Sequence, residues 1–165
     1  MGRLESEFVI TQSVLDRLVD RSRDKDSDYA ASGDVPTTRS EALRRYRESV
    51  KRDLEWLLNT RQNLEPAPDA LKELQKSLYD YGLPDITSIG LHSSRDRDRL
   101  LRTLETTIRR FEPRIANVKV SLEPVQPNSR MLRFRIDGVL MVEPAPEPVI
   151  FNTILELTSG EYEVK

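Results

Sequence analysis

The run Phe111-Glu112-Pro113-Arg114 places a carboxylate and a guanidinium two residues apart, at a point where the chain breaks two local rules. A glutamate at the carboxyl end of a helix faces the negative end of the helix dipole, and the following proline forces Glu112 out of the helical region. In an extended segment, residues two apart point the same way, so we expect Glu112 and Arg114 to project as a fixed charged pair. Such a pair indicates either a functional site or a helix stop closed by an intramolecular salt bridge, and the sequence leaves both readings open.

Catalysis would require more than this pair supplies. Glycoside hydrolysis uses two carboxylates about 5 to 10 Å apart, one of them with a raised pKa. The sequence does not position Glu112 against Asp85 or any other acid, and an adjacent arginine lowers the pKa of a carboxylate, which is wrong for a general acid. His92, the one histidine, lies in a polar stretch without a serine or cysteine nucleophile motif. We therefore predict no catalytic residue, no cofactor and no enzymatic activity.

The composition of the 165 residues excludes several classes of site. The chain has no cysteine and one histidine, which removes disulfide scaffolds, zinc ribbons, iron-sulfur clusters and thiol catalysis, so we predict no metal site. No apolar run approaches the roughly 18 residues of a membrane helix, and the N-terminus has no basic stretch followed by an apolar one. We expect an intracellular, cytoplasmic protein that does not insert into a membrane.

The net charge of -2 conceals two basic segments. Arg39–Arg61 and Arg95–Arg114 each carry seven cations and four anions, so the rest of the chain is acidic. Basic helices bind nucleic-acid backbones, but each of these interleaves carboxylates that repel phosphate, and no aromatic or glycine run accompanies them. We favour a solvated helix face rich in ion pairs and keep nucleic-acid binding as an alternative.

The spacing of apolar residues sets the expected fold. Their period is near 3.6 in the first two thirds of the chain and near 2 in the last third. This order predicts an α+β fold of one domain over residues 1–165, with N-terminal helices packed on a small C-terminal mixed β-sheet. Residues 22–36 are expected to form a flexible surface loop. The predicted helices are Thr11–Arg21, Thr38–Thr60, Asp69–Tyr79 and Ser93–Phe111.

Two helix ends carry recognisable signals. Ser93 and Asp96 have the spacing of a capping box for the last helix. Gly82 is placed to end the Asp69–Tyr79 helix in the left-handed conformation.

The last third of the chain is expected to form the strands Ile115–Leu122, Met131–Val142 and Val149–Leu157. Within the second strand, Asp137-Gly138 has the composition of a hairpin turn or a bulge. We choose the bulge, because four residues after the glycine would make a weak return strand. We expect the third strand to be an edge strand, since a proline-rich loop precedes it. The residues that alternate along one face of this strand include Val149, Phe151, Thr153 and Leu155.

Trp56 lies outside the apolar stripe of its helix, at about 130° from the centre of the stripe. Either a second element, such as the first helix, covers this tryptophan, or it anchors a partner protein. We favour the first reading and keep Trp56 as a candidate partner contact.

Three separated motifs carry a family resemblance. They read SVKRDLEWLLNTR over Ser49–Arg61, YGLPD over Tyr81–Asp85 and FEPR over Phe111–Arg114. In this order and spacing they resemble TssE, the baseplate component of the bacterial type VI secretion system, which is similar to the small wedge protein of contractile phage tails. The resemblance covers most of the chain after Arg39. It implies a structural adaptor that seeds assembly of the contractile sheath, while a lysozyme-like label on some members keeps a peptidoglycan hydrolase as the alternative.

The resemblance also implies partners. Glu112, Pro113 and Arg114 would hold the wedge proteins TssF and TssG, in a baseplate that also contains TssK. The C-terminal strands would accept strands from the sheath proteins TssB and TssC. We expect loss of either charge, Glu112 or Arg114, to weaken the wedge complex and leave the fold intact.

Overall fold

A computed structural model describes residues 39–84, 93–124, 131–143, 145–156 and 159–165. The predicted helix Thr11–Arg21, the predicted loop 22–36, Asp85 and His92 lie outside the described residues. The described elements are α2 (Arg39–Asn59), α3 (Lys72–Gln75), α4 (Ser94–Phe111), β1 (Ile115–Leu122), β2 (Met131–Leu140), β3 (Glu147–Glu156) and β4 (Tyr162–Val164).

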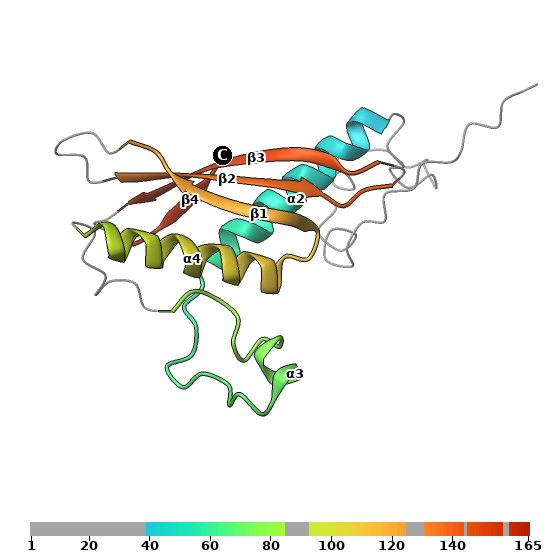
Figure 1. Ribbon diagram of the computed structural model, residues 1–165. Helices are drawn as coiled ribbons and strands as arrows, with labels where there is room; N and C mark the ends of the chain where they lie inside the picture. The colour runs from blue at the N-terminus through green and yellow to red at the C-terminus, as the bar shows by residue number, and fades with distance from the viewer. Residues whose placement is uncertain (1–38, 85–92, 125–130, 144, 157–158) are drawn as a thin grey trace, which may run out of the picture.

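The four strands form one sheet in the order β1-β2-β3-β4, and every neighbouring pair is antiparallel. The helix α4 runs along one face of this sheet, and α2 lies diagonally across the sheet (Figure 1). The α+β class is therefore confirmed, but the sheet is antiparallel and not mixed. The reason is that the connections between its strands are far shorter than the dozen or more residues that a parallel crossover needs.

Helices and sheet meet in one apolar core. The predicted stripes of α2 and α4 are confirmed, because each helix buries its apolar face and leaves its charges outside. The largest fully buried side chains are Phe134 of β2 and Phe151 of β3. The core includes Val50, Leu54, Leu57, Leu100, Leu104, Ile108, Phe134, Ile136, Phe151 and Leu155.

The irregularity of the sheet lies in β1 and not in β2. The pairing of β2 with β3 runs without a shift through Asp137 and Gly138, so the bulge predicted at these residues is wrong. The register instead shifts between Ala116 and Lys119 of β1. A Cβ on Gly138 would lie 2.4 Å from Cγ2 of Ile115, so the glycine provides the room for the side chain that precedes the bulge.

The third predicted strand begins earlier than expected and is not at an edge. It runs over Glu147–Glu156, includes Pro148 and lies between β2 and β4. The edge strand β4 was missed because it has only three residues and follows a turn. Burial raises the pKa of Tyr162 in β4, and its hydroxyl has no hydrogen-bond partner among the residues that the structure describes.

Residues 60–84, which follow α2, project from the body and carry α3 at their far end (Figure 1). The predicted helix Asp69–Tyr79 is reduced to four residues, Lys72–Gln75. Leu71 and Leu78, two of the leucines in this stretch, are 52% and 86% exposed. Their spacing suits a helix, but in the described part of the chain no apolar surface packs on these two leucines to stabilise one.

The projecting segment is closed at its neck by backbone contacts. Leu83 N–H donates to Thr60 C=O and Gln62 N–H donates to Leu83 C=O, both at 2.8 Å. Gly82 has a φ of 112°, and a Cβ there would lie 2.4 Å from the Thr60 carbonyl oxygen. The glycine thus closes the neck and does not end a helix. Ser93 is the N-cap of α4 as predicted, but its side chain makes no capping hydrogen bond.

We expect Gly82→Ala to lower the free energy of unfolding by about 2 kcal/mol or more, because it adds a steric clash to the strain of a positive φ. Gly160→Ala is the matched control, since Gly160 also has a positive φ but a Cβ there meets nothing within 4 Å. Strain alone makes its expected cost about 1 kcal/mol. Urea unfolding of both variants measures the difference, and equal losses would show that the neck contact contributes nothing.

Candidate functional site

Glu112 and Arg114 meet at the junction of α4 and β1. The helix ends at Phe111, and Glu112 has a φ of -123° and a ψ of 72°, so proline has displaced it from the helical region as predicted. The guanidinium of Arg114 binds both carboxylate oxygens: Nε donates to Oε1 and Nη2 to Oε2, each at 2.5 Å. The expected charged pair is therefore present in bidentate form.

The same guanidinium reaches across to α2. Its Nη2 donates to Oδ2 of Asp53 at 2.6 Å, and its Nη1 donates to Oγ of Ser49 at 3.1 Å. Four of its five N–H groups are thus bound to described residues, and the second Nη1 hydrogen has no acceptor among those residues. Burial alone would lower the pKa of Arg114, but the hydrogen bonds and charges of Glu112 and then Asp53 outweigh burial and raise it.

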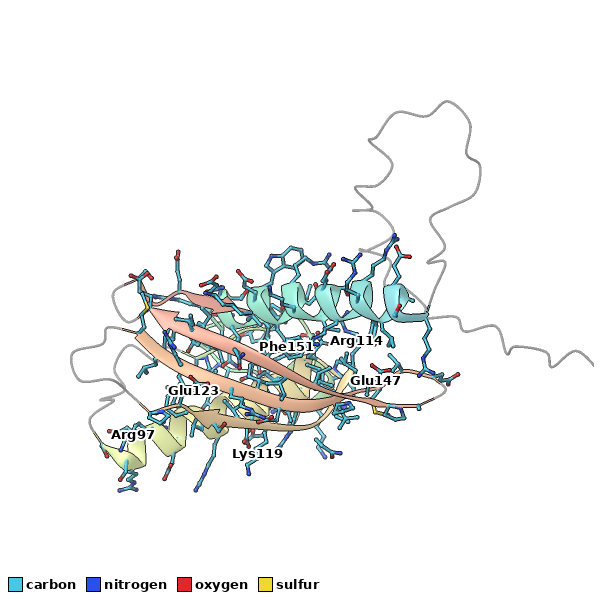
Figure 2. All side chains as sticks on the ribbon, turned by 90° about the horizontal axis from the view of Figure 1, so that it is seen from above. Arg97, Arg114, Lys119, Glu123, Glu147 and Phe151 are labelled. Carbon is cyan, nitrogen blue, oxygen red and sulfur yellow. The ribbon has the colours of Figure 1, made fainter. Side chains whose placement is uncertain are left out.

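The members of this cluster differ in exposure. Glu112 is 4% exposed, whereas the side chains of Arg114 and Asp53 are about one-fifth exposed. The glutamate is therefore an internal residue that fixes the arginine, and only the arginine side of the pair faces outward. This burial revises the expectation that either charge can be removed without cost to the fold. Figure 2 shows Arg114 between α2 and the sheet.

Two tyrosines flank the cluster. Burial is the main cause that raises the pKa of Tyr46 and of Tyr81, and the nearby charges of the cluster modify both. Neither hydroxyl has a hydrogen-bond partner among the described residues. The ring of Tyr81 packs edge-on against Phe111 at 5.3 Å between centroids. Because both phenols stay protonated, each adds a hydrogen-bond donor beside Arg114.

Trp56 extends the cluster along α2. Trp56 is 49% exposed, and the helix Thr11–Arg21 that was expected to cover it lies outside the described residues. The guanidinium of Arg52 lies 5.0 Å from the ring centroid and also donates to Oδ1 of Asp53 at 2.8 and 3.0 Å. A continuous chain of contacts therefore runs from Trp56 through Arg52 and Asp53 to Arg114. We call Trp56, Arg52, Asp53 and Arg114 the arginine patch.

Sequence reasoning missed the α2 half of the arginine patch. Ser49 and Asp53 are four residues apart and lie on one flank of the apolar stripe, so both face the same side of α2 next to the core. That position was the available signal. The candidate residues of β3 are placed elsewhere: Val149, Phe151, Thr153 and Leu155 are each 5% exposed or less and belong to the core face of the sheet.

Side chains of α4 lie on the outer edge of β1. The carboxylate of Glu105 accepts the Val120 N–H at 2.9 Å. Arg109 donates to the Val118 carbonyl oxygen at 2.5 Å. Glu105 and Arg109 also form an ion pair at 3.4 Å.

Side chains of α2 lie on the opposite edge. Asn59 donates through Nδ2 to the Tyr162 carbonyl and accepts the Tyr162 N–H on Oδ1, both at 2.8 Å. Beyond the end of β4, Arg47 donates to the Ile150 carbonyl of β3 at 3.0 Å. Both edges of the sheet thus carry hydrogen bonds from helix side chains.

A groove of about 910 Å³ between α4 and the projecting segment is lined by four arginines, but three aspartates stand among them. This mixture fits the interleaved charges read from the sequence and does not make a phosphate track. Among the described residues, no group of three or more histidines, cysteines, aspartates or glutamates is placed to hold a metal ion. No described helix has the length and apolar character needed to cross a membrane.

The chain was compared with known proteins. A family model described as "Baseplate wedge protein gp25" matches residues 44–145, which is more than half of the chain. Among solved structures, a chain from "The baseplate complex from the type VI secretion system" is 25% identical, with a TM-score of 0.47, and the match covers 68% of this chain and 96% of that one. No curated protein matches.

We expect Arg114→Ala to lower the free energy of unfolding by about 3 kcal/mol or more, because it leaves Glu112 buried without its counterion. Glu112→Ala should cost less, since Arg114 keeps Asp53 and reaches solvent. Arg135→Ala is the control: it removes an exposed pair with Asp137 and should change stability by about 0.5 kcal/mol or less. Chemical unfolding of the three variants measures the order. An Arg114→Ala loss no larger than that of Arg135→Ala would contradict the role of Arg114 as the counterion of the buried Glu112.

Proposed function

Because the chain belongs to the family of the baseplate wedge protein gp25, we propose that it is a structural, non-enzymatic wedge component of a type VI secretion baseplate. The family match carries this proposal, since residues 44–145 include every residue of the arginine patch together with Ser49 and Glu112. The resemblance of the three sequence motifs to TssE favours a secretion system over a phage tail. In this role the chain acts in the cytoplasm and binds other proteins.

We place the wedge partners TssF and TssG, and with them TssK, on the side of the molecule that presents the arginine patch. Arg114 offers an N–H that no described residue accepts, and Tyr46 and Tyr81 add two hydroxyl donors beside it. These donors favour a partner segment that brings acceptors, such as a carboxylate or the carbonyls at a helix end. Trp56 supplies the exposed aromatic ring that is common in interface hot spots. Glu112 and Pro113 position Arg114 in this proposal.

Seeding of the sheath is the second part of the proposal. Strand addition by the sheath proteins TssB and TssC needs a sheet edge, and β3 is interior, so the receiving edge is an outer one. Val149, Phe151, Thr153 and Leu155 then contribute indirectly, by holding the sheet on the helices. An incoming strand beside β4 would have to replace Asn59 on Tyr162.

The peptidoglycan hydrolase is less well supported by the geometry. Glu112 and Asp53 are the carboxylates of the candidate site, and both bind Arg114 at hydrogen-bond distance. A general acid in a glycosidase must meet the glycosidic oxygen of its substrate, whereas Glu112 is 4% exposed and its carboxylate is already held by Arg114. Release of reducing ends from peptidoglycan that disappears in Glu112→Gln, with the fold retained, would favour the hydrolase. A salt titration of binding to DNA and RNA tests the nucleic-acid alternative.

Affinity purification of the tagged chain from cells that make the secretion system tests the proposal directly. We expect the wedge proteins to co-purify, with sheath proteins joining after assembly. Recovery of the chain without any baseplate protein, under conditions where the sheath forms, would count against it.

We expect Trp56→Ala to weaken the purified complex with TssF and TssG while the chain keeps its thermal unfolding midpoint. A hot-spot aromatic contributes about 2 kcal/mol or more, which is roughly thirtyfold in Kd. Met131→Ala removes a side chain of similar exposure, 46%, at the start of β2 and serves as the matched control. Binding titrations decide the matter, and equal affinity of both variants would remove Trp56 from the interface.

A further inference from the structure

The sheet of this chain has polar backbone groups on two outer edges, and such edges are templates for pairing with another strand. The longer edge strand is β1, with eight residues, whereas β4 has three. Along β1, the core face is apolar and the other face is polar, with Lys119 exposed (Figure 2). Two copies of β1 could pair edge to edge about a twofold axis, because an isologous contact pairs a surface with itself. In such a pair the apolar faces of both strands would lie on one side of the joined sheet and the polar faces on the other.

Glu105 and Arg109 each meet a backbone group of the opposite hydrogen-bonding type on the outer edge of β1. Glu105 is an acceptor and lies on an N–H, while Arg109 is a donor and lies on a carbonyl. Successive residues of a strand point their backbone groups to opposite edges, so Val118 and Val120 face away from β2. Glu123 confirms this direction, since its N–H donates to Arg133 of β2. The two side chains thus occupy the groups that a pairing strand would need.

The other edge is closed by the same means. Asn59 fills both hydrogen-bonding positions of Tyr162 with one amide, as the peptide group of a neighbouring strand would. In the part of β3 that β4 does not cover, Pro148 has no N–H to offer and Arg47 occupies the Ile150 carbonyl. Helix side chains thus occupy backbone groups on β1, on β4 and on the part of β3 beyond β4. Protection from strand pairing is therefore a feature of both edges of the sheet.

We infer that Glu105 and Arg109 form an edge clamp that prevents a second copy of this chain from pairing along β1. Unprotected edge strands associate, and native proteins prevent it with bulges and with charged side chains. In β1 the bulge lies between Ala116 and Lys119, and the clamp binds Val118 and Val120 at and just beyond it. The clamp differs from an ordinary surface ion pair, because each charge is also bound to the strand backbone. Its removal frees one donor and one acceptor on the longest edge of the sheet.

The test is the mass of the purified full chain, measured by light scattering from micromolar to millimolar concentration. We expect the wild type to stay monomeric and Glu105→Ala/Arg109→Ala to double its mass as concentration rises. Two controls separate the causes. Arg135→Ala/Asp137→Ala removes an ion pair from the sheet face, and Glu105→Gln breaks the clamp's ion pair while keeping an acceptor for the Val120 N–H. Both controls should stay monomeric.

The position of the contact is tested with cysteine, since the chain has none of its own. Lys119→Cys in the clamp variant should form a disulfide between two copies, and Lys119→Cys alone should not. Circular dichroism first establishes that each variant folds, and Arg109→Ala alone replaces the double variant if that one does not. A folded clamp variant that remains monomeric at every concentration, or that dimerises without the Lys119→Cys disulfide, would overturn the inference.

Discussion

The buried carboxylate of Glu112 is the constraint on which the arrangement of this molecule depends. A buried anion must be paired, and the only guanidinium within reach among the described residues is that of Arg114, two positions further along. That arginine also binds Ser49 and Asp53 of α2, and its carbonyl accepts the Met141 N–H at the end of β2. One ion pair therefore fixes α2, the end of α4 and the sheet relative to one another. Since a buried pair contributes less stability than well-packed apolar side chains would, we interpret it as a device for a unique geometry.

Each of the two long helices, α2 and α4, both covers the face of the sheet and binds one of its edges. Their apolar stripes cover the face of the sheet, and polar residues adjacent to the stripes reach the sheet edges. Glu105 follows the core residue Leu104 in α4, and Asn59 follows the core residue Leu58 in α2. A rotation of either helix that exposed its stripe would also remove its edge contact. Packing of the face and closure of the edges are thus coupled, which favours one orientation of each helix over its neighbours.

The sequence predicted those features that depend on local periodicity. The bounds of α2, α4 and β1 follow from the spacing of apolar residues and from Pro113, and the pairing of Glu112 with Arg114 follows from two residues of extended chain. Contacts between distant residues were beyond such reasoning: Ser49 and Asp53 meet Arg114 across 65 and 61 positions. The helix predicted at Asp69–Tyr79 failed for a related reason, because its apolar spacing is real but none of the described elements covers Leu71 or Leu78. The interior position of β3 depended on β4, a strand too short to leave a periodic signal.

Closed edges set a condition on any protein that joins this sheet by strand addition. An incoming strand gains backbone hydrogen bonds, but it must first displace side chains that already satisfy the same groups, such as Asn59 on Tyr162. Each exchange is close to neutral, since one intramolecular hydrogen bond contributes only about 0.5 to 1.5 kcal/mol net. Affinity must then come from apolar side chains that the added strand buries and from contacts elsewhere on the molecule. The side chains bound to the sheet edges therefore disfavour pairing in brief, chance encounters. Stable strand addition requires a partner that is held at a second surface while its strand replaces these side chains.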